Sequence, residues 1–242
     1  MRIAIISDVH ANLEALEQVL RDSEKQGVEI IHFIGDAVGY GCNPDECVKL
    51  LVKHCDIKLL GNHDYVALGL ESTEAFNKAA QEALSWTQNT ISEKTLEILA
   101  DFELEADYLD YHLVHATPDH PDRWQYLFDT IEAREQFRHF TQSICLIGHS
   151  HFPSIFVQNG DGAVTMHMKS AMQCQPDRRY IVNVGSVGQP RDKDNRACYV
   201  IIDTDANKIL FRRVAYDIDA TQAKMRKARL PEFLIERLAA GV

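Results

Sequence analysis

The chain has 242 residues, of which 45% are hydrophobic and 25% are charged, and its formal net charge is −11. This length and composition are typical of a globular protein with enough core to fold without disulfide bonds. Because an acidic surface repels a polyanion, the charge argues against extended nucleic acid as the main partner.

The apolar residues do not form a membrane or secretion signal. No segment approaches the roughly 20 consecutive apolar residues that cross a bilayer, and the short apolar run near the N-terminus does not match a signal peptide. We therefore expect a cytoplasmic protein without membrane contact, whose six cysteines are reduced thiols. Their spacing contains no CxxC pair that would predict a zinc cluster. The sequence leaves the oligomeric state open.

The first part of the chain predicts alternating strands and helices. Continuous apolar runs at residues 2–7, 30–35 and 56–60 have the pattern of strands buried on both faces. Amphipathic segments at residues 12–26 and 43–54 lie between them and predict helices. This alternation favours a largely parallel sheet with helices packed against it.

The pattern changes after residue 72. Two amphipathic helices, at residues 73–91 and 92–102, follow each other without a strand and predict a helical cap insertion at about residues 72–107. Aromatic residues of this cap and of the stretch after it could stack a nucleobase, although core packing is the preferred interpretation for most of them. They are Phe76, Trp86, Tyr108, Trp124 and Tyr126.

The remaining chain is rich in strand signals. A strand ends at His115, a helix covers residues 130–140, and another strand precedes His149. A hairpin with an Asn-Gly-Asp-Gly turn follows at residues 153–168. Three further strands are expected at residues 179–186, 197–203 and 209–217, with a helical tail at residues 219–240. No linker or repeat divides the chain, so we expect a single domain over residues 1–242.

Polar residues that suit divalent cations stand at the end of five expected strands. The carboxyl ends of strands in open sheets are where ligands bind, so we expect these side chains to converge. Each alone has an ordinary interpretation, as a turn residue or a surface histidine, but five in a row point to a metal site. The residues are Asp8, His10, Asp36, Asn62, His63, Asp64, His115, His149 and His151.

The mixture of oxygen and nitrogen donors narrows the kind of metal. It suits Mn²⁺, Fe²⁺, Co²⁺, Ni²⁺ or Zn²⁺, and does not suit the all-oxygen environment that Ca²⁺ prefers. These donors are too many for one tetrahedral ion. They fit two ions bridged by a carboxylate, about 3.5–4 Å apart, as in two-metal hydrolytic sites.

These motifs, in this order, resemble those of the calcineurin-like metallophosphoesterase superfamily. They read DVH at Asp8, GD at Gly35, GNHD at Gly61, His115 alone, and GHSH at Gly148. The later stretch NVGSVGQPRD from Asn183 is similar to a loop of the YfcE-like small phosphodiesterase branch. The resemblance implies an α/β fold of the four-layer αββα type, with two mixed sheets face to face and helices outside.

The resemblance also implies a role for each residue. Two divalent ions are implied, with Mn²⁺ first and Fe, Ni, Co or Zn as alternatives. His63 is implied to act near the leaving group, with Asp64 orienting it. The implied ligands are Asp8, His10 and His151 for the first ion, Asn62, His115 and His149 for the second, and Asp36 for both.

The implied activity is hydrolysis of a phosphate ester by attack of a metal-bound hydroxide. The motifs encode this reaction and not the group attached to the phosphate. A small soluble phosphodiester or nucleotide is the expected substrate, because it fits the acidic chain better than DNA or RNA. A serine/threonine or other phosphomonoester phosphatase, a dinucleoside polyphosphate hydrolase and a non-catalytic metal-binding scaffold are the alternatives.

Two residues outside these motifs are candidates for substrate binding. Asn12 either caps the first helix, which we favour, or contacts substrate. Arg191 either binds a phosphate bidentately or lies on the surface beside a glycine-rich turn.

Overall fold

The computed structural model describes all 242 residues and contains two six-stranded mixed sheets. The first sheet has the order β3-β2-β1-β11-β12-β9. Its strands are β1 (Arg2–Ile6), β2 (Ile30–Ile34), β3 (Lys58–Leu59), β9 (Ala171–Gln173), β11 (Ala197–Asp203) and β12 (Lys208–Val214). The second sheet has the order β4-β5-β6-β10-β7-β8. Its strands are β4 (Glu105–Tyr108), β5 (Tyr111–Val114), β6 (Ile144–Ile147), β7 (Ser154–Gln158), β8 (Val164–His167) and β10 (Arg179–Asn183).

The two sheets pack face to face, which explains why their central strands are apolar throughout. In β1, Ile3 and Ile5 point into the core between the sheets, where they meet Leu146 and Val182 of the second sheet. Ile6, one position on, belongs to the core on the other face of the first sheet. Side chains of a strand alternate between faces, so a strand buried on both faces carries a continuous apolar run.

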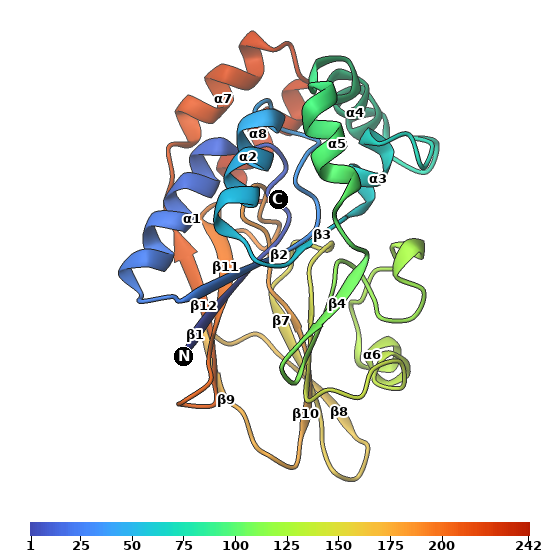
Figure 1. Ribbon diagram of the computed structural model, residues 1–242, viewed down its shortest axis with the longest axis vertical. Helices are drawn as coiled ribbons and strands as arrows, with labels where there is room; N and C mark the ends of the chain where they lie inside the picture. Colours follow the sequence, from blue (N-terminus) through green and yellow to red (C-terminus); the bar gives the residue numbers. More distant parts are fainter.

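Helices cover the outer faces of both sheets, as Figure 1 shows for α1 and α6 on opposite sides. On the first sheet lie α1 (Leu13–Lys25), α2 (Pro44–His54) and α5 (Glu93–Ala100), whose apolar residues share one core with the sheet. On the second sheet, α6 (Thr130–Gln136) contributes Ala133 to a separate core. The α/β sandwich of two mixed sheets is therefore confirmed.

The C-terminal tail packs at one end of the molecule (Figure 1). The sequence predicts one helical tail at residues 219–240, but the structure contains two helices there, α7 (Ile218–Lys227) and α8 (Glu232–Ala240). Pro231 lies between them, and its ring and missing N–H oppose a continuous helix. These helices share a core with α4 (Lys78–Thr90) and with the ring of Tyr40. None of the helices combines the length and apolar character needed to cross a bilayer.

The expected cap insertion at residues 72–107 differs from the structure at both ends. It contains α4 and α5, but α4 begins five residues later than expected, with Asn77 as its N-cap. The stretch ends in β4, an edge strand that pairs antiparallel with β5. The polar sequence of β4 carries no buried strand pattern because only one neighbour pairs with it. Moreover, α5 packs on α2 and does not form a lid.

Candidate metal centre

The strand-end residues meet at one edge of the sandwich. Asp8 follows β1, Asp36 follows β2, and Asn62 opens the short helix α3 (Asn62–Ala67) after β3, all from the first sheet. His115 follows β5 and His149 follows β6, both from the second sheet. All nine predicted residues are buried, and the most exposed of them, Asn62, has an exposed fraction of only 7%. The carboxyl ends of strands from both sheets therefore form one polar centre.

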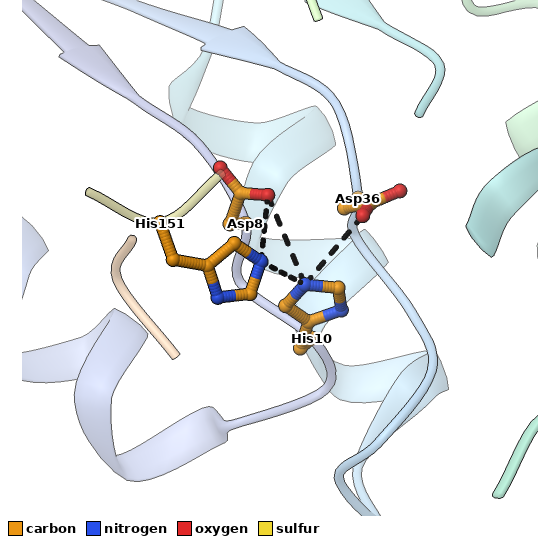
Figure 2. A group of neighbouring side chains, drawn as sticks. All are labelled: Asp8, His10, Asp36 and His151. Atoms are coloured by element: carbon orange, nitrogen blue, oxygen red, sulfur yellow. Dashed lines mark hydrogen bonds and ion pairs between the residues drawn. The ribbon is translucent and has the colours of Figure 1, made fainter. Parts of the chain in front are cut away.

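Four of these residues form a first group. The Nε2 atoms of His10 and His151 are 3.0 Å apart, and Asp8 Oδ1 lies 3.1 Å from His151 Nε2. Asp36 Oδ2 lies 3.5 Å from His10 Nε2. Figure 2 shows the two imidazoles turning one nitrogen each toward the same space as these carboxylates.

Asp36 is also part of a second group. Its Oδ2 lies 3.4 Å from His115 Nε2, and the donor atoms of Asp36, His115 and His149 are within 4.8 Å of one another. Asn62 lies beside them in the wall of the same cavity. The donor atoms therefore form two groups that share Asp36.

Main-chain carbonyls hold three of the imidazoles in place. Each ring contacts a carbonyl oxygen through Nδ1, which leaves Nε2 free to face the centre. A protonated Nδ1 that donates to a carbonyl fixes both the tautomer and the ring orientation, as is usual for metal-binding histidines. The pairs are His10 with Val38 at 3.1 Å, His115 with Ile34 at 2.9 Å, and His151 with Gln189 at 2.6 Å.

Several donor atoms of the centre are buried without a hydrogen-bond partner. A buried polar atom without a partner is costly, and such atoms normally bind a ligand, an ion or water. Here they belong to both groups and include carboxylate, amide and imidazole donors, which suit borderline divalent ions. The residues therefore fit a divalent metal site. The atoms are Asp8 Oδ1, Asn62 Oδ1, His115 Nε2 and His149 Nε2.

The charges of the centre keep the carboxylates of Asp8 and Asp36 ionised by holding their pKa values below the usual range. Burial alone would raise the pKa of Asp36, but the imidazoles of His115 and His63 outweigh it and hold that pKa well below its usual range. Burial would conversely lower the pKa of His115, but the Asp36 carboxylate raises it to about 9. Ionised carboxylates are the form that binds cations.

The backbone of the centre is unusual for residues with side chains. Five candidate ligands have φ in the left-handed region, which non-glycine residues seldom adopt. They are Asp8 (54°), His10 (48°), Asp36 (61°), His149 (63°) and His151 (59°). Gly148 is required for a different reason, since a Cβ there would lie 2.5 Å from Asp8 Oδ2. The turns after the strands are thus shaped to aim side chains at one point.

Comparison with known proteins decides the family. A model described as the calcineurin-like phosphoesterase superfamily domain matches residues 1–207. The chain belongs to the calcineurin-like phosphoesterase superfamily. It is 42% identical over 244 residues to an uncharacterized protein of Methanocaldococcus jannaschii, covering 99% of this chain and 98% of that protein. Members of the calcineurin-like phosphoesterase superfamily are generally hydrolases. Family membership, together with the two His/Asp groups, indicates that this chain binds divalent metal ions.

Solved structures support the same assignment. A metallophosphoesterase from Sphaerobacter thermophilus superposes with a TM-score of 0.87 at 41% identity, covering 100% of this chain and 99% of the other. A hypothetical protein from Pyrococcus horikoshii gives a TM-score of 0.79 at 19% identity, covering 100% and 98%. The second likeness shows a shared fold.

His63 and Asp64 have different surroundings. The His63 ring lies between Tyr40 and Phe76, with centroids 4.4 and 5.1 Å away, and faces the cavity. The expected contact between Asp64 and this ring is absent. The Asp64 carboxylate instead accepts main-chain N–H groups of Asp36, Ala37, Val38 and Gly61, at 2.9–3.1 Å. Asp64 therefore shapes the turn that carries Asp36.

The two candidates for substrate binding, Asn12 and Arg191, also differ in their surroundings. Asn12 caps α1 by accepting the N–H of Ala15 at 3.2 Å and donates to the Gly188 carbonyl at 2.8 Å, so its side chain is occupied by structural bonds. Arg191 lines the cavity beside the centre. The structure thus gives Asn12 the cap role that we favoured, and it places Arg191 within reach of a ligand.

The cavity beside the metal centre has a volume of about 410 Å³ and contains residues that the sequence did not indicate. Of the aromatic residues noted in the sequence, Phe76, Trp124 and Tyr126 line it, and Tyr126 stacks on His149 with centroids 4.2 Å apart. Trp86 and Tyr108 pack in the cores instead. The missed lining residues include Tyr40, Glu71, Arg123, Phe233 and Arg237. No local pattern marks them, because tertiary packing alone brings them to the cavity.

Proposed function

We propose that this protein is a hydrolase of phosphate esters that depends on two divalent ions. The most favoured activity is that of a phosphodiesterase acting on a small soluble phosphodiester or nucleotide. The observation that carries the proposal is the pair of donor groups that share Asp36 and open into one cavity. The small substrate would be its principal partner, and its expected compartment is the cytoplasm.

Each group would hold one ion, with Mn²⁺ first and Fe, Ni, Co or Zn as alternatives. When bound, the ions would lower the pKa of a water molecule and offset the charge of the phosphate. The two donor groups that share Asp36 support the following ligand assignment, to which we add the buried Asn62 Oδ1. Asp8, His10 and His151 belong to the first ion, Asn62, His115 and His149 to the second, and Asp36 to both.

Residues of the cavity would act on the substrate directly. His63 faces the cavity but belongs to neither donor group, and its Nδ1 is buried without a partner. Its ring could donate a proton or a hydrogen bond to the departing oxygen, as a general acid does. The rings of Tyr40 and Phe76 hold it in that position.

The shape of the cavity favours a small substrate. Its volume of about 410 Å³ lies within the range of small-molecule sites, about 300–1,000 Å³. The net charge of −11 also disfavours a long polyanion. Phosphomonoesters, dinucleoside polyphosphates and phosphoproteins are the alternative substrates. A scaffold without activity would have no need for the free His63 ring in the cavity.

A turnover panel tests this proposal. The chelator-treated protein is supplied with Mn²⁺ and assayed on bis-p-nitrophenyl phosphate, p-nitrophenyl phosphate, cyclic nucleotides, dinucleoside polyphosphates and a phosphopeptide, with metal content measured by elemental analysis. We expect two ions per chain and the highest kcat/KM on a diester or nucleotide. Two bound ions without turnover of any compound would favour the scaffold, and a preference for the phosphopeptide would favour a protein phosphatase.

A further inference from the structure

The C-terminal helices contribute to the wall of the cavity although they lie outside the family match. The matching region ends at residue 207, whereas α8 supplies Phe233 and Arg237 to the cavity. Leu234 and Leu238 on the same helix are buried in the core shared with Tyr40. This packing fixes α8 beside the candidate metal centre, so its lining residues belong to this chain and not to the shared motifs.

Two arginines of this wall have no carboxylate side chain within ion-pair distance. Arg191 donates to Gln189 Oε1 at 2.9 Å and reaches the Tyr40 hydroxyl at 3.4 Å. Arg237 donates its Nε to a main-chain oxygen of Val242. Both side chains are only partly exposed.

Other partly buried arginines of the chain are paired differently. Arg212 forms an ion pair with Asp22 at 3.0 Å, and Arg213 pairs with Asp192. Arg179, which is also partly buried, donates to main-chain carbonyls and has no acidic partner. Arg191 and Arg237 differ from Arg179 in that they line the cavity. The N–H groups of Arg191 and Arg237 that do not donate to Gln189, Tyr40 or Val242 are available to an anionic ligand.

The two guanidinium groups are close enough to repel each other. Burial and, after it, the positive charge of Arg191 together lower the pKa of Arg237 to about 10. Arg237 therefore remains protonated near neutral pH. An anion between or beside them would relieve this repulsion, and a guanidinium binds a phosphate through two parallel hydrogen bonds.

We propose that Arg237, with Arg191 beside it, binds a second phosphate group of the substrate, which makes Arg237 a specificity-determining residue. The proposal rests on the proposed function and names its substrate class: small phosphate esters that carry a further phosphate. The ring of Tyr40 contacts both His63, at 4.4 Å between centroids, and the Arg191 guanidinium, at 5.7 Å. The second phosphate therefore lies on the side of the departing group.

Competition between two nucleotides tests this proposal. Adenosine 5′-monophosphate and adenosine 3′,5′-bisphosphate are compared as inhibitors of bis-p-nitrophenyl phosphate turnover by the Mn²⁺-loaded protein. We expect the bisphosphate to bind at least about tenfold more tightly than the monophosphate, since one charge-assisted pair contributes about that factor. In Arg237→Gln this ratio should fall to near one, and Arg237→Lys should restore part of it.

Arg229→Gln is the matched control, because the substitution removes the same charge. Arg229 is exposed between α7 and α8 and does not line the cavity. The variant should keep the wild-type ratio. Titration calorimetry of the two nucleotides on the chelator-treated protein gives a second readout without turnover. If no ester is hydrolysed, the proposed function fails while calorimetry still tests Arg237. A bisphosphate preference that is absent in the wild type, or that survives Arg237→Gln, would overturn the inference.

Discussion

His63 differs from the other imidazoles of the centre in what surrounds it. The rings of His10, His115 and His151 are fixed by main-chain carbonyls and face carboxylates. The ring of His63 is fixed by aromatic packing, and a Cβ at Gly39 would lie 2.3 Å from its Nδ1. The His63 imidazole is held by packing and lies beside the donor groups without belonging to them. Such a ring is suited to act on the substrate.

We therefore expect His63→Ala to retain both metal ions and to lower kcat by about 10²–10⁴-fold. The loss should be greater for esters of alcohols than for nitrophenyl esters, because a poor leaving group depends more on proton donation. Elemental analysis and steady-state kinetics on both ester types measure the effect. Full activity with alkyl esters would remove His63 from the reaction, and loss of metal would make it a ligand.

The turn after β2 is the element on which the centre depends most. Asp36 lies in it with φ of 61°, and α3 presents the Asp64 carboxylate to four of the surrounding N–H groups. The N–H of His63 in turn donates to Asp36 Oδ1 at 2.9 Å. The turn and the helix thus hold each other, so the donor shared by both groups is fixed by its neighbours before any ligand binds.

Asp64→Asn should destabilise the protein by about 3 kcal/mol, since an amide replaces a buried carboxylate oxygen with a donor that faces other donors. Urea unfolding of the chelator-treated protein measures the change in the free energy of unfolding. Asp101→Asn is the matched control, because Asp101 is exposed at the end of α5. Equal stability of the two variants would show that the N–H groups find other partners.

The strand-end motifs could be predicted because each is local. A buried strand and the polar residues directly after it are visible in a few neighbouring positions, so Asp8, Asp36 and His149 were found. The edge strand β4 was missed because its polar residues give no buried pattern. Arg237 was missed because only the packing of α8 on Tyr40 brings it to the cavity. The role expected for Asp64 was wrong because hydrogen bonds to the main chain leave no mark in the sequence.

At the scale of the whole molecule, the core between the sheets contains an ionisable group. His32 on β2 is fully buried, its ring lies 4.5 Å from that of Tyr108, and its Nε2 has no partner. Burial lowers its pKa from 6.5 to about 4. The folded protein therefore keeps His32 neutral under conditions in which the unfolded chain protonates it.

Because the unfolded state binds the additional proton, the stability from His32 is fully present above pH 6.5 and is lost as the pH falls toward 4. Between pH 7 and pH 5 this loss amounts to about 2 kcal/mol. Urea unfolding at both pH values should show a smaller decrease for His32→Gln than for the wild type. The exposed His54 gives the control, and His54→Gln should behave as the wild type does. The same decrease in all three proteins would contradict the assignment to His32.

Each donor group contains residues from both sheets. His151 of the second sheet joins Asp8 and Asp36 of the first, and His115 joins the same Asp36 from the other side. A bound ion at either position would be a covalent-like cross-link between the two layers, in a chain whose six cysteines are all free. The metal centre would then also connect the two sheets at the edge formed by the carboxyl ends of their strands. Depleting the metal would remove this link and leave the core and hydrogen bonds, such as that between His115 Nδ1 and the Ile34 carbonyl, to connect the two sheets there.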